Sequence, residues 1–331
     1  MAGVGGRGSQ RGGQSVKPNW SLIALNASFA SQIEAGTSDF GVSGHDLAVE
    51  VTGDPFVDGE VTAAGDQGWV ITRTPNTDNL ELCAAEFVLE AGIYPADGEL
   101  QGEGREVLRG LIDAAIDVAR SEGRRYLVTE ATWPGSEAHP FEQELRSRGF
   151  RLAHNEFTSA YNLRERPLTS LDPLPPEFAV VQYDSVQPPA PLANGVIRLY
   201  NQANRDLPHG LLPRPDTRWD QHRLEAAQAK AKRQGLIQST TAILDSRGAV
   251  VGLSETTFGP GTAMQHGLTI VDPDYRGRRL AGAMERRALL HLRLLNPFAR
   301  RVYWTAPGSD FPAHFGYEPV CEHRYWMLAL S

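Results

Sequence analysis

The sequence predicts an α+β protein of two similar halves, each a mixed, mostly antiparallel sheet flanked by helices. The length of 331 residues exceeds that of one typical domain and favours two. The proline-rich segment 164–178, RERPLTSLDPLPPEF, separates two strand-like runs and predicts a linker. The same order of strands and helices recurs on either side, which is typical of a duplicated domain. We expect a disordered tail over 1–18, domains over 19–165 and 178–331, and a linker over 166–177.

Composition sets the broad class of the protein. Glycine and small polar residues dominate the first 17 positions, and such a tail cannot bury enough apolar surface to offset its ordering entropy. A net charge of -8 and a pI of about 5.6 argue against a nucleic-acid partner. No apolar run approaches the roughly 18 residues that a membrane span needs. Cys83 and Cys321 lack metal or redox spacing, so we expect a cytoplasmic protein with reduced cysteines and no metal site.

In the C-terminal half, turn and helix-stop signals separate the predicted strands and helices. A strand and two helices are predicted first, over 178–183, 192–207 and 218–235. Three strands separated by hairpin signals follow, over 239–245, 249–258 and 263–271. The next helix stops at Asn296-Pro297 and carries the apolar stripe Leu280, Met284, Ala288, Leu292 and Leu295. Two last strands are predicted over 300–306 and 324–330.

The N-terminal half repeats this plan. Strands are predicted over 20–26, 69–74, 80–94, 125–131 and 157–163. One helix is predicted over 106–120 and a second is expected to end at Arg148. The first of these helices places Leu108, Leu111, Ile112, Ala115, Val118 and Ala119 on one face.

The segment DYRGRRLAGAME, at the start of the long C-terminal helix, suggests an anion site. Backbone N–H groups in the first turn of a helix have no intrahelical acceptor, and the helix dipole adds partial positive charge there. Gly277 allows a close approach of the backbone, and Arg276 and two further arginines add charge. A diphosphate fits such a turn, and a plain helix start with solvated arginines is the alternative.

The run TIVDPDYRGRRLAGAMERRAL resembles the central motif of the GCN5-related N-acetyltransferases (GNATs). The similarity extends to RDLPHGLLPRPDTRW, AVVGLSETTF and FGYEPV, as in actinobacterial two-domain members of the mycothiol-synthase type. The resemblance implies two tandem GNAT-like domains that use acetyl-CoA or another acyl-CoA. In the pattern Q/R-x-x-G-x-G/A, Arg276 and Ala281 match, while Arg279 replaces a glycine. The residues implied to bind the cofactor are Leu268, Thr269, Ile270, Val271, Arg276, Gly277, Arg278, Arg279, Leu280 and Ala281.

Amine acylation needs a base for the amine, a donor to the oxyanion and a proton for the leaving thiolate. Glu255 is the first candidate for the base and His266 the second. The resemblance implies that the backbone N–H of Leu268 or Ile270 polarises the thioester carbonyl. The sequence departs from the family at the general acid, because the segment from Arg276 to Gly316 is shorter than its N-terminal counterpart. Pro307 and Pro312 predict that no helix forms there, which leaves Ser309, His314 and Tyr317 as candidates.

At the turn before the helix, the N-terminal half has acidic residues where the C-terminal half has arginines. Gln101 to Glu106 aligns with Arg276 to Ala281, and Glu99, Glu103 and Glu106 surround the corresponding turn. Since carboxylates also favour a helix N-terminus, we expect this half to fill its own anion site and to bind no coenzyme. A second active site is the alternative.

The predicted function is transfer of an acetyl group to an amine of a small molecule. The acceptor is expected between the halves, contacted by Asp206, His209 and Trp219 of the proline-rich loop. A non-catalytic CoA-binding sensor and an aminoacyl-tRNA-dependent acyltransferase remain as alternatives. The sequence leaves the oligomeric state open.

Overall fold

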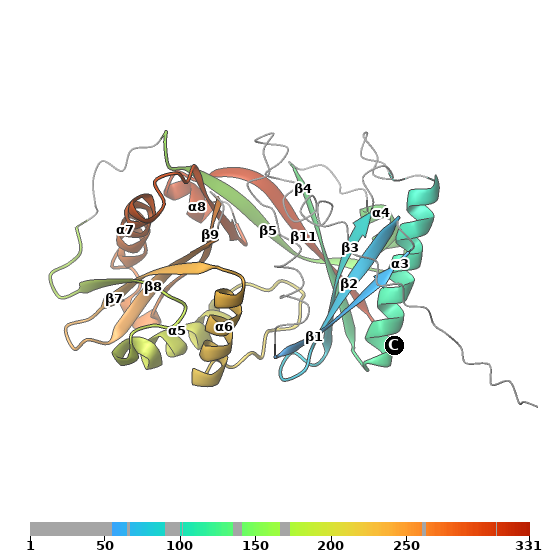
Figure 1. The fold of residues 1–331 in the computed structure, drawn as a ribbon, viewed down its shortest axis with the longest axis horizontal. Helices are drawn as coiled ribbons and strands as arrows, with labels where there is room; N and C mark the ends of the chain where they lie inside the picture. The colour runs from blue at the N-terminus through green and yellow to red at the C-terminus, as the bar shows by residue number, and fades with distance from the viewer. Residues whose placement is uncertain are drawn as a thin grey trace, which may run out of the picture.

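A computed structural model describes residues 55–64, 67–89, 100, 102–134, 141–165, 173–259, 263–308 and 310–331. The predicted tail and the predicted strand 20–26 lie outside these residues. The described strands form one sheet of eleven, in the order β1-β2-β3-β4-β11-β5-β10-β9-β8-β7-β6 (Figure 1). Helices cover this mixed sheet, so the predicted α+β class is confirmed.

The described part of the N-terminal half contains five strands and two helices. In chain order these are β1 (Val57–Ala63), β2 (Gly68–Pro75), β3 (Leu82–Leu89), α3 (Gly102–Ser121), β4 (Tyr126–Pro134), α4 (Glu142–Ser147) and β5 (Arg151–Asn162). The predicted helix face of α3 packs on the sheet, with Leu108, Leu111, Ile112 and Ala115 buried. The strand β1 is an addition, because its sequence VDGEVTA carries little apolar signal.

The C-terminal half, from residue 173, contains the remaining elements. These are β6 (Ala179–Asp184), the 3₁₀ turn η1 (Ala190–Leu192), α5 (Ala193–Asp206), α6 (Gln221–Arg233), β7 (Ile237–Leu244), β8 (Val250–Phe258), β9 (Ala263–Val271), the 3₁₀ turn η2 (Pro273–Tyr275), α7 (Leu280–Leu295), β10 (Arg301–Ala306), α8 (Asp310–His314) and β11 (Glu318–Ala329). All of the strands and helices predicted for this half are present within a few residues, β11 being longer than predicted.

Opposite faces of the C-terminal sheet carry different helices (Figure 1). Leu253 and Ile270 pack with Val196 and Leu199 of α5. Ile243 and Val251 pack instead with Leu280 and Met284 of α7. Successive side chains of a strand point to opposite faces, so β7 supplies Ala242 to the first cluster and Ile243 to the second. In β8 a register shift leaves Val251 as an extra residue, and Val251 and Leu253 consequently lie on opposite faces although they are two positions apart.

The last strand of each half lies inside the sheet of the other half. β11 pairs with β4 over nine residues and with β5, while β5 pairs with β10. Trp326 of β11 is consequently fully buried in the core that α3 covers. The halves therefore share one continuous sheet, and the predicted domain limits remain a prediction.

The segment before β11 corrects one prediction. Residues 310–314 form the short helix α8, although Pro312 was expected to prevent a helix. Proline is tolerated here because α8 is a single turn and Pro312 is its third residue, where the backbone N–H has no intrahelical acceptor. The carbonyl of Pro312 accepts hydrogen bonds from the N–H groups of Phe315 and Tyr317 at 3.0 and 3.2 Å.

Two strands separate where the candidate site lies. β9 and β10 are parallel and pair only from Arg301↔Ala263 to Trp304↔His266. A register shift follows on β9, because Thr256 pairs with His266 and Glu255 with Leu268, leaving Gly267 as the extra residue. From Leu268 to Val271, β9 pairs with β8 alone among the described strands, and its other edge is open.

Candidate active site

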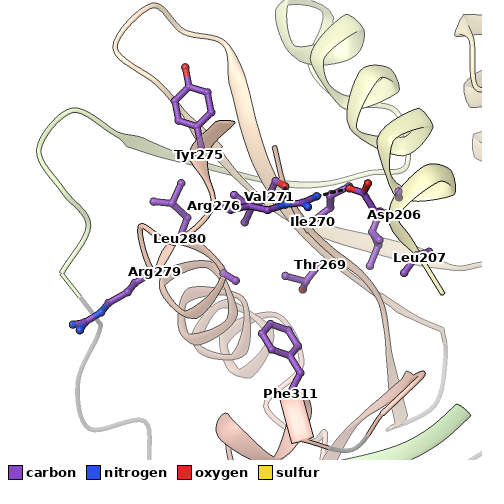
Figure 2. Close-up of a pocket in the computed structure, with 14 residues that line it drawn as sticks. Asp206, Leu207, Thr269, Ile270, Val271, Tyr275, Arg276, Arg279, Leu280 and Phe311 are labelled. Atoms are coloured by element: carbon purple, nitrogen blue, oxygen red, sulfur yellow. Dashed lines mark hydrogen bonds and ion pairs between the residues drawn. The ribbon is translucent and has the colours of Figure 1, made fainter. Parts of the chain in front are cut away.

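A pocket of about 570 Å³ opens beside the free edge of β9. Figure 2 shows it between β9, the start of α7, the end of α5 and Phe311 of α8. Its lining includes every predicted cofactor residue except Arg278. The guanidinium of Arg278 lies over the ring of Tyr275 instead, 5.3 Å from its centroid. The structure thus brings the predicted residues together, while their roles remain predictions.

The turn that enters α7 has the backbone shape of an anion-binding turn. Gly277 has φ of 78°, and Arg279, the N-cap of α7, has φ of 60° and ψ of 20°. Arg279 therefore holds the left-handed conformation that glycine adopts without strain. The first helical bond runs from the Ala283 N–H to the Arg279 carbonyl at 3.2 Å. The amides of the first turn precede this bond and lie beside the pocket.

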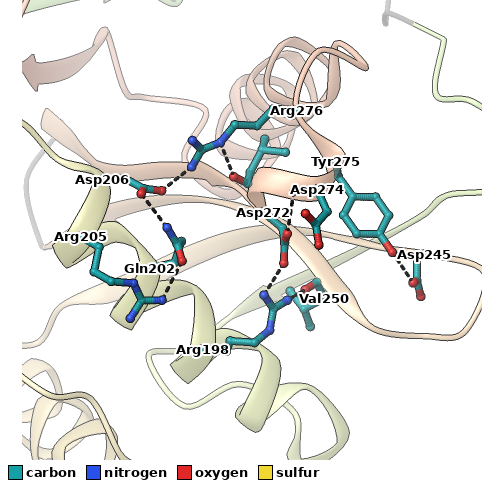
Figure 3. A network of polar contacts seen from close by, with 11 residues as sticks. Arg198, Gln202, Arg205, Asp206, Asp245, Val250, Asp272, Asp274, Tyr275 and Arg276 are labelled. Carbon is teal, nitrogen blue, oxygen red and sulfur yellow. Dashed lines mark hydrogen bonds and ion pairs between the residues drawn. The ribbon is translucent and has the colours of Figure 1, made fainter.

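The two arginines that line the pocket point in different directions. The Arg279 side chain extends away from the pocket in Figure 2. Arg276 instead forms an ion pair with Asp206 of α5, and its Nε donates to the Val271 carbonyl at 3.1 Å (Figure 3). Asp206 also accepts a hydrogen bond from the side chain of Gln202 at 2.6 Å. An anion in the pocket would therefore share the Arg276 charge with Asp206.

Glu255 is buried on the face of the sheet that α5 covers. Its Oε1 accepts hydrogen bonds from the Tyr200 hydroxyl at 2.6 Å and from the Gln238 side chain at 3.0 Å. Burial raises the pKa of Glu255 to about 7, and the hydrogen bond from Tyr200 opposes that rise. A carboxylate with this pKa can accept a proton near neutral pH. Glu255 pairs with Leu268 across β8 and β9, which places it next to the pocket-lining strand.

His266 and Tyr317 meet through a residue that the sequence analysis did not identify. Glu285 of α7 is fully buried, accepts a hydrogen bond from the Tyr317 hydroxyl at 2.6 Å, and lies 3.7 Å from Nε2 of His266. Burial lowers the pKa of His266, and the Glu285 charge opposes this effect. Burial and the Glu285 charge raise the pKa of Tyr317 well above its ordinary value. The signal for Glu285 was its position four residues after Ala281 and four before Leu289, inside an apolar stripe.

The other candidates for the acid lie elsewhere. Ser309 lies outside the described residues. His314 is exposed at the end of α8, where its ring contacts Phe315. The residue that α8 contributes to the pocket is Phe311, which has no hydroxyl.

The predicted acceptor residues lie apart from one another. Asp206 lines the pocket, while His209 uses Nδ1 to contact the Leu212 carbonyl at 2.8 Å. Trp219 packs on Tyr200, with ring centroids 4.7 Å apart, and lines a separate hollow of about 380 Å³. The sequence pattern therefore grouped residues that the fold separates.

The N-terminal half anchors the loop that carries His209 and Trp219. Asn79 and Asp216 exchange hydrogen bonds, and Asn79 donates to the Thr217 hydroxyl at 2.8 Å. The N–H of Leu211 donates to the Ala153 carbonyl at 2.7 Å. The loop between α5 and α6 is thus fixed to the other half at both of its ends.

At the corresponding turn of the N-terminal half, Glu103 lies in the first turn of α3 and accepts a hydrogen bond from the Gln67 side chain. Glu106 is exposed on the same helix, and Glu99 and Gln101 lie outside the described residues. A carboxylate of the chain itself is therefore present at this helix start. The prediction that this half binds no coenzyme stays a prediction.

The described part of the chain contains no group of three or more His, Cys, Asp or Glu that could hold a metal ion. None of its helices is long and apolar enough to cross a membrane.

Comparison with known proteins gives matches among solved structures alone. No protein-family model and no curated protein matches the chain. A tandem GNAT protein from the clavulanic acid biosynthesis pathway is similar at 16% identity and a TM-score of 0.71, with 94% of each chain covered. A GCN5-related N-acetyltransferase from Sphaerobacter thermophilus shares 12% identity at a TM-score of 0.59, covering 94% of this chain and 91% of its own. One from Kribbella flavida shares 12% identity at a TM-score of 0.53, with 92% and 95% covered.

These similarities extend over nearly the whole chain, so they concern the arrangement of both halves. They do not distinguish the mycothiol-synthase type, which stays a prediction. With an open β9 edge, a basic turn into α7 and interleaved last strands, the chain has the fold of a tandem GCN5-related N-acetyltransferase.

Proposed function

We propose that the protein is an acyl-CoA-dependent N-acyltransferase whose active site is the pocket between β9 and α7. The observation that carries this proposal is continuity: the free edge of β9 leads through the short 3₁₀ turn η2 into the left-handed turn at the N-terminus of α7. One ligand can therefore contact an extended strand edge and a helix start at once. Acyl-CoA has this shape, with an amide-containing arm attached to a diphosphate.

The residues present fit that donor. The first-turn amides of α7, with Arg276 beside them, suit the diphosphate. The backbone groups of Leu268 to Ile270 on the open edge of β9 are proposed to bond the amide arm, as an added strand would. The acyl-CoA supplies an activated thioester, and the chain supplies binding, orientation and proton transfer.

Glu255 is proposed as the general base. With a pKa of about 7, the Glu255 carboxylate is basic enough to take a proton from the amine near neutral pH. It lies on the face that α5 covers, and the acceptor amine is proposed to approach from that face.

The same face offers polar groups from both halves for an acceptor. Oγ1 of Thr158 on β5 lies 2.6 Å from Oγ1 of Thr305 on β10 and 2.6 Å from Nε2 of His323 on β11. Nδ1 of His323 lies 2.6 Å from Glu130 of β4. We therefore place a polar small-molecule amine over the strands where the halves interleave.

Charge reversal at Arg276 and at Arg278, two positions further on, tests donor binding. Arg276→Glu should weaken acetyl-CoA binding by about tenfold or more, because it removes a cation and adds an anion at the diphosphate turn. Arg278→Glu makes the same change in charge outside the pocket and should stay within about threefold of wild type. Isothermal titration calorimetry measures both. Absence of binding to the wild-type protein, or equal loss in both variants, contradicts the proposal.

Catalysis needs a second measurement. Release of free CoA thiol in the presence of a panel of small amines distinguishes transfer from binding alone. A non-catalytic CoA-binding protein remains the second candidate, because Phe311 leaves α8 without a hydroxyl at the pocket. That candidate predicts acetyl-CoA binding without thiol release for any amine.

A further inference from the structure

Among the described residues that line the pocket, Thr269 carries a hydroxyl that can face the donor. Among the described lining residues, the side chains of Thr269 and Tyr275 carry hydroxyl groups. The Tyr275 hydroxyl donates to Asp245 at 2.9 Å and points away from the pocket (Figures 2 and 3). Thr269 lies on the open part of β9, between Phe311 and the Arg276–Asp206 pair in Figure 2. A donor arm running along β9 from the α7 turn therefore passes Thr269.

A chain of buried polar groups continues behind Thr269, on the face that α7 covers. Nε2 of His266 lies 2.8 Å from Oγ1 of Thr269, and Nδ1 lies 3.3 Å from Oγ1 of Thr256. Trp304 covers the imidazole, with ring centroids 4.1 Å apart. His266 does not line the pocket, so it reaches the pocket through Thr269.

Glu285 closes this chain and is the group that packing alone does not explain. Its Oε1 accepts a hydrogen bond from the Tyr317 hydroxyl. Its Oε2 is buried with no hydrogen-bond partner among the described residues and lies 3.7 Å from Nε2 of His266. A fully buried carboxylate with an unsatisfied oxygen is costly in a helix that could carry an apolar residue. Its placement gives an imidazolium at His266 the counter-charge that a buried cation needs.

We propose that Thr269 is the proton donor to the leaving thiolate, and that His266, Glu285 and Tyr317 are positioning residues that restore its proton. This inference rests on the proposed acyl-CoA-dependent function. The amine nitrogen forms the new C–N bond and loses a proton to Glu255. The C–S bond breaks, and its electron pair goes to sulfur. Sulfur takes the Thr269 hydroxyl proton, and the Thr269 oxygen takes the Nε2 proton of the His266 imidazolium.

The step balances without another reactant. Because burial lowers the pKa of His266, its imidazolium is the minority form near neutral pH, and the Glu285 carboxylate supplies the counter-charge that allows it to form. After the step the imidazole is neutral. The proton that Glu255 received returns to solvent, and one proton from solvent restores His266. The net reaction is amine plus thioester giving amide plus thiol.

The test combines a binding measurement with a rate measurement. Thr269→Val keeps the shape and removes the hydroxyl, while Thr269→Ser keeps the hydroxyl. Thr256→Val is the matched control, because it removes a hydroxyl that contacts the same imidazole outside the pocket lining. Ultraviolet thiolate absorbance, followed against pH with saturating CoA, reports the pKa of the bound thiol.

The wild-type protein, Thr269→Ser and Thr256→Val should give the same low thiol pKa, because a hydroxyl donor stabilises the thiolate. Thr269→Val should raise that pKa by about one. In the acetyl-CoA reaction with the best amine of the panel, Thr269→Val should lower kcat by about 100-fold at unchanged KM for acetyl-CoA. His266→Ala should lower kcat similarly, and Tyr317→Phe less.

The failures are distinguishable. A wild-type thiol pKa in Thr269→Val, or a wild-type kcat, overturns the role of Thr269 and leaves the acyltransferase proposal standing. Loss of activity in Thr256→Val equal to that in Thr269→Val also overturns it, because both would then act by disturbing His266. No CoA binding to the wild-type protein overturns both proposals.

Discussion

Single residues at this site carry unfavourable states that the fold maintains. Arg279 adopts a left-handed backbone, Glu255 is a buried carboxyl with its pKa raised to about 7, and Glu285 is buried with an unsatisfied oxygen. Each state costs free energy, and such costs are concentrated at functional sites. All three residues lie within or directly beside the strand and helix that form the pocket.

The Glu255 carboxyl gives a prediction with a definite sign. Its pKa is about 7 in the folded protein against an ordinary value of 4.5, so the folded state binds this proton more tightly. Its stabilising contribution is present below pH 4.5 and is lost as the pH rises through 7. Glu255→Gln should therefore raise the melting temperature relative to wild type at pH 8, and hardly at pH 4.5. Thermal unfolding at the two pH values measures this, and an equal effect at both would contradict it.

The same residue governs the predicted rate profile. In the wild-type protein kcat/KM should rise with pH up to about 7, as the base loses its proton. Glu255→Gln should lower kcat/KM by about 100-fold and remove that limb, with acetyl-CoA affinity unchanged. Thiol release across the pH range tests this, and an unchanged profile in the variant would exclude Glu255 as the base.

Arg279 gives a stability prediction that separates strain from function. Because its φ of 60° is strained for any residue with a Cβ, Arg279→Gly should raise the free energy of unfolding by up to about 1 kcal/mol. Gly277→Ala is the matched reverse change, since a Cβ there meets no atom within 4 Å, and it should lower stability by about 1 kcal/mol. Urea unfolding measures both. A loss of stability in Arg279→Gly would show that its side chain has a role that the backbone argument misses.

At the scale of elements, the N-termini of α7 and α3 use the same physical principle for different purposes. α7 begins beside a pocket that arginines line, whereas α3 has Glu103 in its first turn. A helix N-terminus stabilises negative charge from either source. The chain's own carboxylate can therefore take the place of a ligand.

Transferring the acidic pattern tests this directly. Ala281→Glu puts at α7 the residue found at the aligned position 106 and should weaken acetyl-CoA binding by about tenfold or more, through repulsion of the diphosphate. Ala281→Gln adds similar bulk without charge and should weaken it much less. Calorimetry in low and high salt separates the two terms, because repulsion is screened and bulk is not. Equal losses in the two variants would attribute the effect to size.

At the scale of the whole molecule, the interleaved strands make the halves depend on each other. Trp326, three residues inside the end of the last strand, is fully buried in the core that α3 covers, beneath the Arg146 guanidinium. β5 in turn covers the edge of β10 beside the site. The N-terminal half therefore supports the C-terminal pocket through the sheet as well as through the loop between α5 and α6.

Two measurements follow from this arrangement. Trp326→Ala should lower the free energy of unfolding by about 3–5 kcal/mol, because it empties a large buried volume. Residues 1–172 and 173–331 expressed separately should each fail to give a cooperative unfolding transition, and should copurify and bind acetyl-CoA when expressed together. A C-terminal fragment that folds and binds acetyl-CoA alone would contradict the dependence.

The sequence predicted those elements whose signal is local. Apolar stripes fixed α3 and α7, hairpin signals fixed β7 to β9, and the glycine- and arginine-rich turn predicted the residues that line the pocket. The turn was predictable because helix starts bind anions for reasons that lie in the backbone itself. The short helix α8 was missed because proline was treated as a breaker, whereas its place in a single turn makes it tolerable.

Tertiary structure alone decided which distant residues meet. Nothing in the pattern of β11 indicates that it lies between β4 and β5, since strand order depends on pairing between segments that are about 160 to 200 residues apart. The same holds for Glu285, which reads as one more charge on a helix until Tyr317 and His266 are placed around it. Local backbone preferences depend on consecutive residues and can therefore be predicted from the sequence. The partners of a strand edge or of a buried carboxylate depend on how the whole chain packs.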